Sequence, residues 1–143
     1  MEHRIVMSKF SLELEEDFDF YMLGICSHVK DYRLCWELNQ NLEIKLTKNS
    51  DLEIVSQGET KLYSFNCDED DNKANDYYLI SNKSPQGYLV PEEKKCDYFL
   101  VIKGPLSEDE EKAILATINE SKNVLTSYPI EASELKSKNN LIF

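Results

Sequence analysis

The most informative pattern in the chain is a run of five consecutive apolar residues, Tyr98–Ile102. A half-exposed strand alternates apolar and polar residues, so an uninterrupted apolar run predicts a strand that is covered on both faces. We therefore expect this segment to lie in the middle of a sheet. Residues 91–95 hold a proline, two glutamates and two lysines, which do not suit a sheet interior. They predict an exposed loop that leads into the central strand.

Further strands are predicted where apolar and polar residues alternate with a period of two, or where a short apolar run is bounded by polar residues. The expected segments are 10–14 at a sheet edge, 18–26, 42–46, 52–55, 61–67, 77–82 and 123–128. We expect 61–67 and 77–82 to pair as a hairpin. Segment 18–26 has apolar residues at both odd and even positions, so its pattern also fits a short helix. Turns are predicted at 57–59 and 84–87, where glycine and proline occupy positions that turns favour.

Two helices are predicted from apolar residues at the spacing of one helical face. The first spans 30–41 with Asp31 as its expected N-cap. Its buried stripe is expected to consist of Leu34, Cys35, Leu38 and Leu42. The second begins at Ser107, which can form a capping box with Glu110, and ends near Ser121. Its buried stripe is expected to consist of Ile114, Leu115 and Ile118.

The first helix carries a second, aromatic surface. Tyr32 and Trp36 are four residues apart and therefore share a face that differs from the buried stripe. Two interpretations remain open: the rings wrap the flank of the core, or they contact a partner. The second fits the preference of interfaces for tryptophan and tyrosine.

The order of these elements favours an α+β fold, with a mainly antiparallel sheet and two helices packed on one face. The nearest simple arrangement is ferredoxin-like, with extra hairpin strands. At 143 residues the chain is expected to form a single globular domain over 1–143, with a frayed start at 1–9 and a C-terminal tail at 131–143. The tail ends in Leu141, Ile142 and Phe143, which are expected either to dock on the body or to meet a partner.

The segment before the central strand resembles a known signature. Val90-Pro91-Glu92, three further residues and then Cys96-Asp97-Tyr98 are similar to the motif that gives the IPExxxVDY family its name. Val90 stands where that motif has isoleucine, and Cys96 stands where it has valine. The resemblance implies a single domain of a bacterial cytoplasmic protein. It brings no catalytic residue or cofactor, and it leaves open whether Pro91, Glu92, Asp97 and Tyr98 act structurally or functionally.

Charge narrows the range of partners. The formal net charge is −11, from 27 acidic and 16 basic residues, which opposes binding to nucleic acids and to anionic membranes. The acidic run at 68–76 lacks the glycine and glutamate that a calcium loop of the EF-hand type requires, so it predicts a solvated hairpin tip. No apolar run reaches membrane-spanning length, and the first residues lack a signal-peptide pattern. We therefore expect a cytoplasmic location and neither a nucleic-acid nor a membrane partner.

The residue types of metal and catalytic sites are sparse. The four cysteines form no C-x-x-C pair, and the two histidines are isolated at His3 and His28. No phosphate-binding, dinucleotide-binding or nucleophile-elbow motif is present in the sequence. We expect buried, unbridged thiols, no metal, no cofactor and no identified catalytic residue.

Three functional hypotheses follow. The first is a protein-interaction or scaffold module, bound to a partner protein or to a second copy through Tyr32, Trp36 and residues 141–143. The alternative is an enzyme or small-ligand-binding protein with a cleft around Glu92, Asp97 and Tyr98. A third, weaker hypothesis is an acidic protein that occupies the groove of a nucleic-acid-binding partner.

Overall fold

The computed structural model describes residues 18–143, so the predictions for the strand at 10–14 and for the frayed start lie outside the described residues. Its main elements are β1 (Tyr21–Cys26), α2 (Asp31–Leu42), β2 (Thr47–Lys48), β3 (Leu52–Ser56), β4 (Glu59–Tyr63), β5 (Phe65–Asp68), β6 (Asp76–Ser81), β7 (Lys83–Ser84), β8 (Gly87–Tyr88), β9 (Tyr98–Lys103), α3 (Glu108–Asn119) and β10 (Thr126–Pro129). Short 3-10 segments are η1 (Pro91–Glu93), η2 (Ala132–Glu134) and η3 (Lys138–Leu141). The fold is α+β, as predicted.

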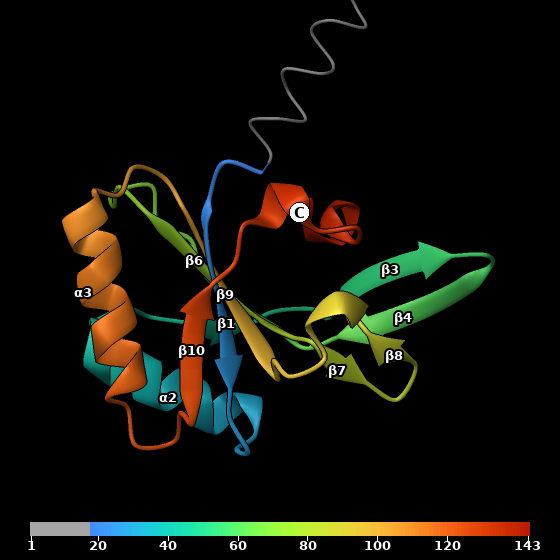
Figure 1. Cartoon of the computed structure of the whole chain (residues 1–143), viewed down its shortest axis with the longest axis horizontal. Coiled ribbons are helices and arrows are strands. Elements are labelled where there is room, and N and C mark those ends of the chain that lie inside the picture. The colour runs from blue at the N-terminus through green and yellow to red at the C-terminus, as the bar shows by residue number, and fades with distance from the viewer. Residues whose placement is uncertain (1–17) are drawn as a thin grey trace, which may run out of the picture.

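Six strands form one antiparallel sheet in the order β10-β1-β9-β6-β5-β2 (Figure 1). The strand β9 pairs with β1 on one side and with β6 on the other, so that Leu100 lies between Leu23 and Leu79. Residues 99–102 are fully buried. The prediction of a central strand covered on both faces is therefore confirmed.

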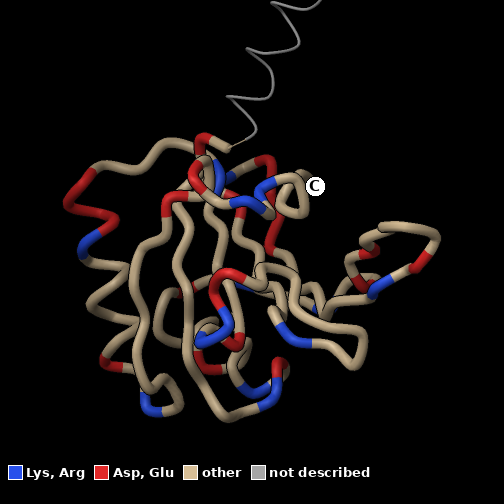
Figure 2. The backbone as a smooth tube through the Cα atoms, turned by 45° about the vertical axis from the view of Figure 1, so that its right-hand side comes forward, with Lys and Arg blue, Asp and Glu red and all other residues tan. Residues whose placement is uncertain are grey.

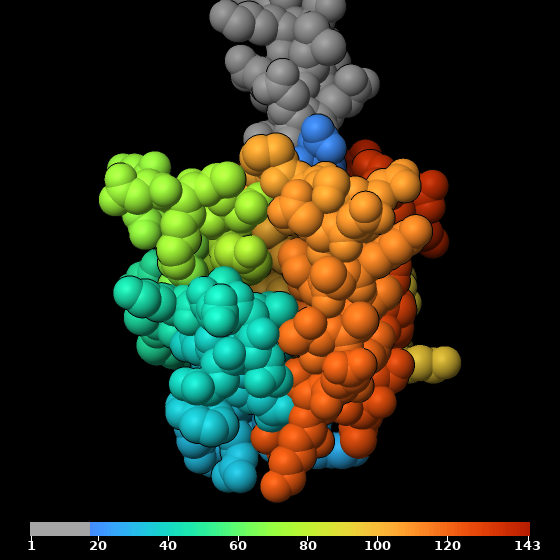
Figure 3. All heavy atoms as spheres, turned by 90° about the vertical axis from the view of Figure 1, so that its left-hand side faces the viewer, coloured from blue at the N-terminus to red at the C-terminus, as the bar shows by residue number. Residues whose placement is uncertain are grey.

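The two long helices cover one face of the sheet. Figure 3 looks onto this face, where α2 in cyan and α3 in orange lie side by side. The buried cluster beneath them consists of Leu23, Ile25, Leu34, Cys35, Leu38, Ile44, Leu46, Leu79, Tyr98, Leu100, Ile102, Ile118 and Val124. The apolar stripes of both helices point into this cluster, with Leu42, Ile114 and Leu115 packed at its border. We call this side of the sheet the helical face.

Short hairpins and irregular segments cover the opposite side, which we call the loop face (Figure 1). Its buried cluster consists of Met22, Tyr63, Cys67, Tyr78, Ile80, Leu89, Val90, Cys96, Phe99, Val101, Ala132 and Leu141. Alternate residues of β9 therefore enter two different cores, because successive side chains of a strand point to opposite faces. The coverage comes from the residues around η1, η2 and η3 and from the hairpin β3–β4.

Charged residues lie mainly in turns and helices, and the strands at the centre of the sheet remain uncharged along most of their length (Figure 2). The strand β1 holds no charged residue, and β9 holds only Lys103 at its end. Ser107 and Glu110 form the predicted capping box at the start of α3. The turn between β3 and β4 is also confirmed, with Gln57 and Gly58 at φ values of 52° and 79°.

The strand predicted at 42–46 is wrong. The helix α2 continues to Leu42 and ends at Glu43, which has the left-handed φ of 55°. Beyond it, the Asn39 side chain donates to the Leu46 carbonyl oxygen and accepts from the Leu46 amide, at 3.1 and 2.8 Å. This amide side chain therefore occupies the backbone groups of Leu46 that a strand would use.

Two further predictions need correction. Segment 61–67 is not one strand, because it divides at Ser64 into β4 and β5, which belong to different sheets. Its expected pairing with 77–82 holds for the β5 part alone. Asp31 does not cap α2: Lys30 occupies the N-cap position, and the Asp31 carboxylate accepts hydrogen bonds from Ser64 and Lys48.

Candidate functional site

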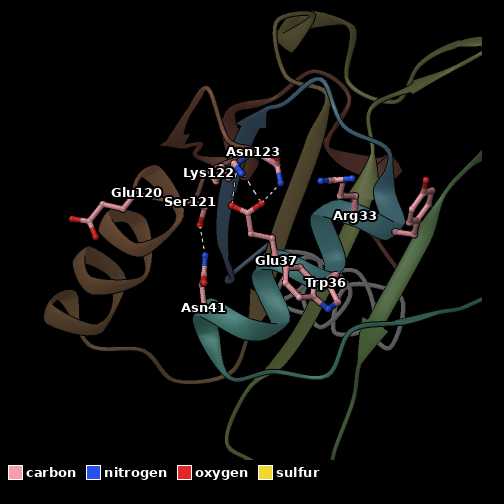
Figure 4. Close-up of a pocket in the computed structure, with 9 residues that line it drawn as sticks. Arg33, Trp36, Glu37, Asn41, Glu120, Ser121, Lys122 and Asn123 are labelled. Atoms are coloured by element: carbon pink, nitrogen blue, oxygen red, sulfur yellow. Dashed lines mark hydrogen bonds between the residues drawn. The ribbon is translucent and has the colours of Figure 1, made fainter.

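An open groove on the helical side runs between α2 and the loop that joins α3 to β10. Its volume is about 700 Å³, and we call it the α2 groove (Figure 4). Its lining consists of Tyr32, Arg33, Trp36, Glu37, Asn41, Glu120, Ser121, Lys122 and Asn123. The groove therefore joins two segments that are separated by about eighty residues of sequence, and only its α2 side was singled out by the sequence.

The two aromatic residues of α2 line the groove and are largely exposed. Tyr32 is 70% exposed and Trp36 is 65% exposed. Both belong to the helix surface that turns away from the buried Leu34 and Leu38, since each residue advances about 100° around a helix. Of the two interpretations of this aromatic surface, the one in which the rings wrap the flank of the core does not fit these exposures.

Glu37 closes the base of the α2 groove. Its side chain is buried, and the two carboxylate oxygens accept hydrogen bonds from the Asn123 backbone amide at 3.0 and 3.3 Å. The Asn123 side-chain amide donates to the same carboxylate. A buried carboxylate is tolerable when hydrogen bonds replace its lost water. Glu37 is thus committed to holding the α3–β10 loop against α2.

A second tie fixes the far end of the groove. The Asn41 side-chain amide donates to Ser121 Oγ at 2.8 Å, and Ser121 Oγ donates in turn to the Thr117 carbonyl oxygen at 3.0 Å (Figure 4). The walls of the groove are therefore joined by side-chain hydrogen bonds at two places. Such ties pre-organise a binding surface, because little side-chain or loop freedom remains to be lost on binding.

Two basic side chains at the rim of the groove are available to a bound molecule. Within residues 18–143, the side chains of Arg33 and Lys122 form no hydrogen bond or ion pair. An unpaired guanidinium next to an exposed indole suits a carboxylate that accompanies an apolar group, since Arg presents a fork of donors to carboxylates. The groove therefore offers contact area and hydrogen-bond donors to a bound molecule.

The signature residues lie elsewhere and bind within the chain. Pro91 opens η1 at the surface, and the Glu92 carboxylate accepts hydrogen bonds from the Ser137 amide at 2.8 Å and the Ser137 hydroxyl at 2.7 Å. Burial alone would raise the pKa of Glu92, but these hydrogen bonds outweigh it and lower the pKa. Glu92 thereby ties η1 to the C-terminal segment.

Asp97 and Tyr98 fix the start of α2. Asp97 accepts from the Ser27 amide at 2.8 Å and from Lys83 Nζ at 2.7 Å. The Tyr98 hydroxyl donates to the Val29 carbonyl oxygen at 2.7 Å. Burial, followed by the nearby carboxylates of Asp31 and Asp97, raises the pKa of Tyr98 to about 12, so this hydroxyl remains protonated at neutral pH. None of the signature residues lines the α2 groove.

Asn82 organises the signature segment and was missed by the sequence analysis. Its fully buried side chain donates to the carbonyl oxygens of Glu93 and Cys96, both at 2.9 Å, and accepts from the Val90 amide at 2.8 Å. Three backbone groups of an irregular loop are thus satisfied by one side chain. The available signal was an asparagine that directly follows an apolar strand, a pattern that many exposed turns share.

The C-terminal tripeptide lies against the body of the protein. Leu141 is fully buried, and the ring of Phe143 meets those of Phe65 and Tyr78 edge-on at 5.1 Å. Lys103 Nζ donates to the Phe143 carbonyl oxygen at 2.7 Å. The tripeptide was expected either to dock on the body or to meet a partner, and the observed contacts are those of docking. Of its three residues, only Ile142 leaves a substantial apolar surface exposed.

The comparisons with known proteins add no relative. No family model matches the chain, and no curated protein matches it. The resemblance to the IPExxxVDY family therefore stays a prediction. Within residues 18–143, no group of three or more His, Cys, Asp or Glu side chains is placed to hold a metal ion. Neither α2 nor α3 has the length and apolar character that crossing a bilayer requires, in the part of the chain that the structure describes.

Proposed function

We propose that this protein is an interaction module and that the α2 groove binds a segment of a partner protein. The observation that carries the proposal is the exposure of Tyr32 and Trp36 on one helix surface at a pre-formed hollow. Tryptophan and tyrosine are the residues on which binding energy concentrates in protein interfaces. Their rings bury a large area at little cost in side-chain entropy.

The preferred partner segment combines an apolar side chain with a carboxylate. The indole of Trp36 and the ring of Tyr32 offer the apolar contact, while Arg33 and Lys122 offer donors that no group within residues 18–143 uses. Glu120 at the opposite wall disfavours a second carboxylate there. The partner is another protein or a second copy of this chain. The net charge of −11 supports the view that nucleic acids and anionic membranes are not partners.

The alternative, an enzyme or ligand-binding site around Glu92, Asp97 and Tyr98, has less support. Each of these side chains is engaged by a hydrogen bond within the chain: Glu92 binds Ser137 of the C-terminal segment, whereas Asp97 and Tyr98 bind residues between β1 and α2. We also propose, from the same signature, membership in the IPExxxVDY family and a cytoplasmic location. The order β10-β1-β9-β6, with a helix in each crossover, supports a ferredoxin-like relationship in which β5 and β2 extend one edge.

The proposal is tested by capture from a lysate of the host cell. Immobilised wild-type protein is compared with Trp36→Ala and Tyr32→Ala, and bound proteins are quantified by mass spectrometry. We expect at least about a tenfold loss of the specifically bound protein for Trp36→Ala, the factor that corresponds to 1.4 kcal/mol. Light scattering of the same variants reports whether the partner is a second copy.

Val55→Ala is the matched control, because Val55 is 69% exposed on the β3–β4 hairpin, outside the α2 groove. Its capture should equal that of the wild type. Equal capture by Trp36→Ala and wild type, or a loss specific to Val55→Ala, would contradict the proposed role of the groove. Circular dichroism of each variant establishes that the fold is retained.

A further inference from the structure

Two of the four cysteine side chains meet on the loop face. Cys26 ends β1 and is partly exposed, whereas Cys96 is buried just before β9. The Cys26 thiol reaches the carbonyl oxygen of Lys95, the residue directly before Cys96, so the two cysteines lie at the same place on this face. Cys35 and Cys67 are both buried, Cys35 in the core of the helical face and Cys67 beside the Asn49 side chain. The Cys26–Cys96 pair is therefore distinct from the two remaining thiols.

Backbone contacts fix both members of the pair. The Cys26 thiol donates to the Lys95 carbonyl oxygen at 3.1 Å, which belongs to the peptide group that joins Lys95 to Cys96. Gly24 supplies the space for the second thiol, because a Cβ atom at this position would lie 2.4 Å from Cys96 Sγ. The strand β1 and the signature segment thus bring the two cysteines to the same place on the loop face.

Burial and neighbouring polar groups set the protonation of the two thiols. The Tyr128 hydroxyl contacts Cys96 Sγ at 3.1 Å and the Glu93 carboxylate at 2.9 Å. Burial raises the pKa of Cys96 to about 11 and also raises the pKa of Cys26. Both thiols are therefore largely protonated at neutral pH, and Cys26 is the one that a solute can reach.

We propose that Cys26 and Cys96 form an oxidation site at which a hydroperoxide converts the two thiols into an intramolecular disulfide. The Cys26 sulfur, after losing its proton to solvent, attacks the peroxide oxygen, and the O–O bond breaks to give a sulfenic acid and water or an alcohol. The deprotonated Cys96 sulfur then attacks the Cys26 sulfur. The S–S bond forms, the S–O bond breaks, and hydroxide leaves as water after taking up a proton. The two sulfurs lose two electrons and the peroxide gains them.

The disulfide would fasten the signature segment to β1. It would close a loop from Cys26 to Cys96, which restricts the unfolded chain and so favours the folded state. A disulfide adds little strain when the backbone positions of its two cysteines match disulfide geometry. The expected consequence is a higher Tm for the oxidised protein than for the reduced protein.

The test uses the full chain, reduced, freed of reductant and treated with hydrogen peroxide. The remaining thiols are alkylated under denaturing conditions, and peptides are identified by mass spectrometry without reduction. We expect loss of two of the four thiols, a peptide pair joined through Cys26 and Cys96, and alkylated Cys35 and Cys67. A Tm that rises on oxidation and returns to its starting value after reduction completes the expected result.

The variants separate the roles of the two thiols. In Cys96→Ser, oxidation should stop at a sulfenic acid or a higher oxide on Cys26, since no neighbouring thiol resolves it. In Cys26→Ser, Cys96 should remain alkylatable after the same treatment. The proposal is overturned if the wild-type chain yields no Cys26–Cys96 peptide pair, or if Cys35 or Cys67 enters the disulfide instead. The wild-type experiment decides the matter even if a variant fails to fold.

Discussion

The helical face and the loop face of the sheet share the same strands but achieve their burial differently. On the helical face, two amphipathic helices place regular apolar stripes over the sheet. On the loop face, short segments without a repeating pattern place single residues such as Leu89, Val90 and Leu141 into the core. Their backbone groups rely on side chains such as Asn82 and Glu92 for hydrogen bonds.

The two faces therefore depend on different interactions: apolar burial on the helical face, and hydrogen bonds to backbone groups on the loop face. A helix satisfies its own backbone, so its contribution depends mainly on the apolar area that it buries. An irregular segment leaves amide and carbonyl groups to be satisfied by other means, and each one left without a partner is costly when buried. Polar substitutions should therefore be most damaging on the loop face. On the helical side, Tyr32 and Trp36 of α2 stay largely exposed.

The largest expected effects come from neighbouring residues of β9 that enter opposite cores. Phe99 points to the loop face and Leu100 to the helical face, and both are fully buried. We expect Phe99→Ala to lower the free energy of unfolding by about 3–5 kcal/mol and Leu100→Ala by about 2–5 kcal/mol. Urea unfolding followed by circular dichroism measures both. A cost below about 1 kcal/mol for either variant would show that its face lacks a tightly packed core.

Asn82→Ala should be the most damaging polar change and should act on the loop face first. It removes three hydrogen bonds to buried backbone groups, so we expect a loss of about 3 kcal/mol in the free energy of unfolding. Native-state hydrogen exchange should show a faster Val90 amide and little change in the α2 amides. Asn72→Ala in the exposed hairpin tip is the matched control, with an expected change within about 0.5 kcal/mol. Equal losses for the two variants would remove the role assigned to Asn82.

The central strand and the two helices could be predicted from the sequence. The apolar run at 98–102, the stripes of both helices and the Ser107 capping box each follow a period or spacing that local chemistry imposes. The loop face was not predicted, because its coverage depends on contacts between residues far apart in the chain. Asn82 meets Glu93 and Cys96, and Glu92 meets Ser137, through bonds for which no short motif exists.

The candidate site also divides into a part that was predicted and a part that was not. The exposed pair Tyr32 and Trp36 was identified from helical spacing alone, whereas the opposite wall at Ser121–Asn123 was found only in the folded structure. Asp31 and Asn39 mark two local failures. The Asp31 carboxylate binds Lys48 instead of capping α2. The Asn39 side chain binds the Leu46 backbone, where a strand was predicted.

Ser107→Ala should produce a smaller effect, confined to the helical face. The Ser107 hydroxyl accepts from the Glu110 amide at 3.1 Å, and the Glu110 carboxylate accepts from the Ser107 amide at 3.3 Å. We expect a loss of about 1 kcal/mol in the free energy of unfolding, the usual cost of an N-cap. Ser107→Thr should retain most of this stability because its hydroxyl can cap in the same way. A larger loss for Thr than for Ala would contradict the capping role.

The smallest expected effect is a pH dependence on the loop face. Since hydrogen bonds hold the pKa of Glu92 below its ordinary value of 4.5, the folded state favours the ionised carboxylate. Its contribution is therefore full above pH 4.5 and is lost as the pH falls through the lowered pKa. The stability difference between wild type and Glu92→Gln, measured by urea unfolding, should be largest near neutral pH and shrink toward pH 3. A difference that grows with acidity would contradict this sign.

The central claim is that the helical face recognises a partner while the signature on the loop face serves structure. The most direct test compares capture of lysate proteins by Trp36→Ala and Glu92→Gln, each confirmed as folded by circular dichroism. The account predicts that Trp36→Ala loses the protein bound by wild type and that Glu92→Gln retains it. Retention by Trp36→Ala together with loss by Glu92→Gln would place the functional surface on the loop face and contradict the account.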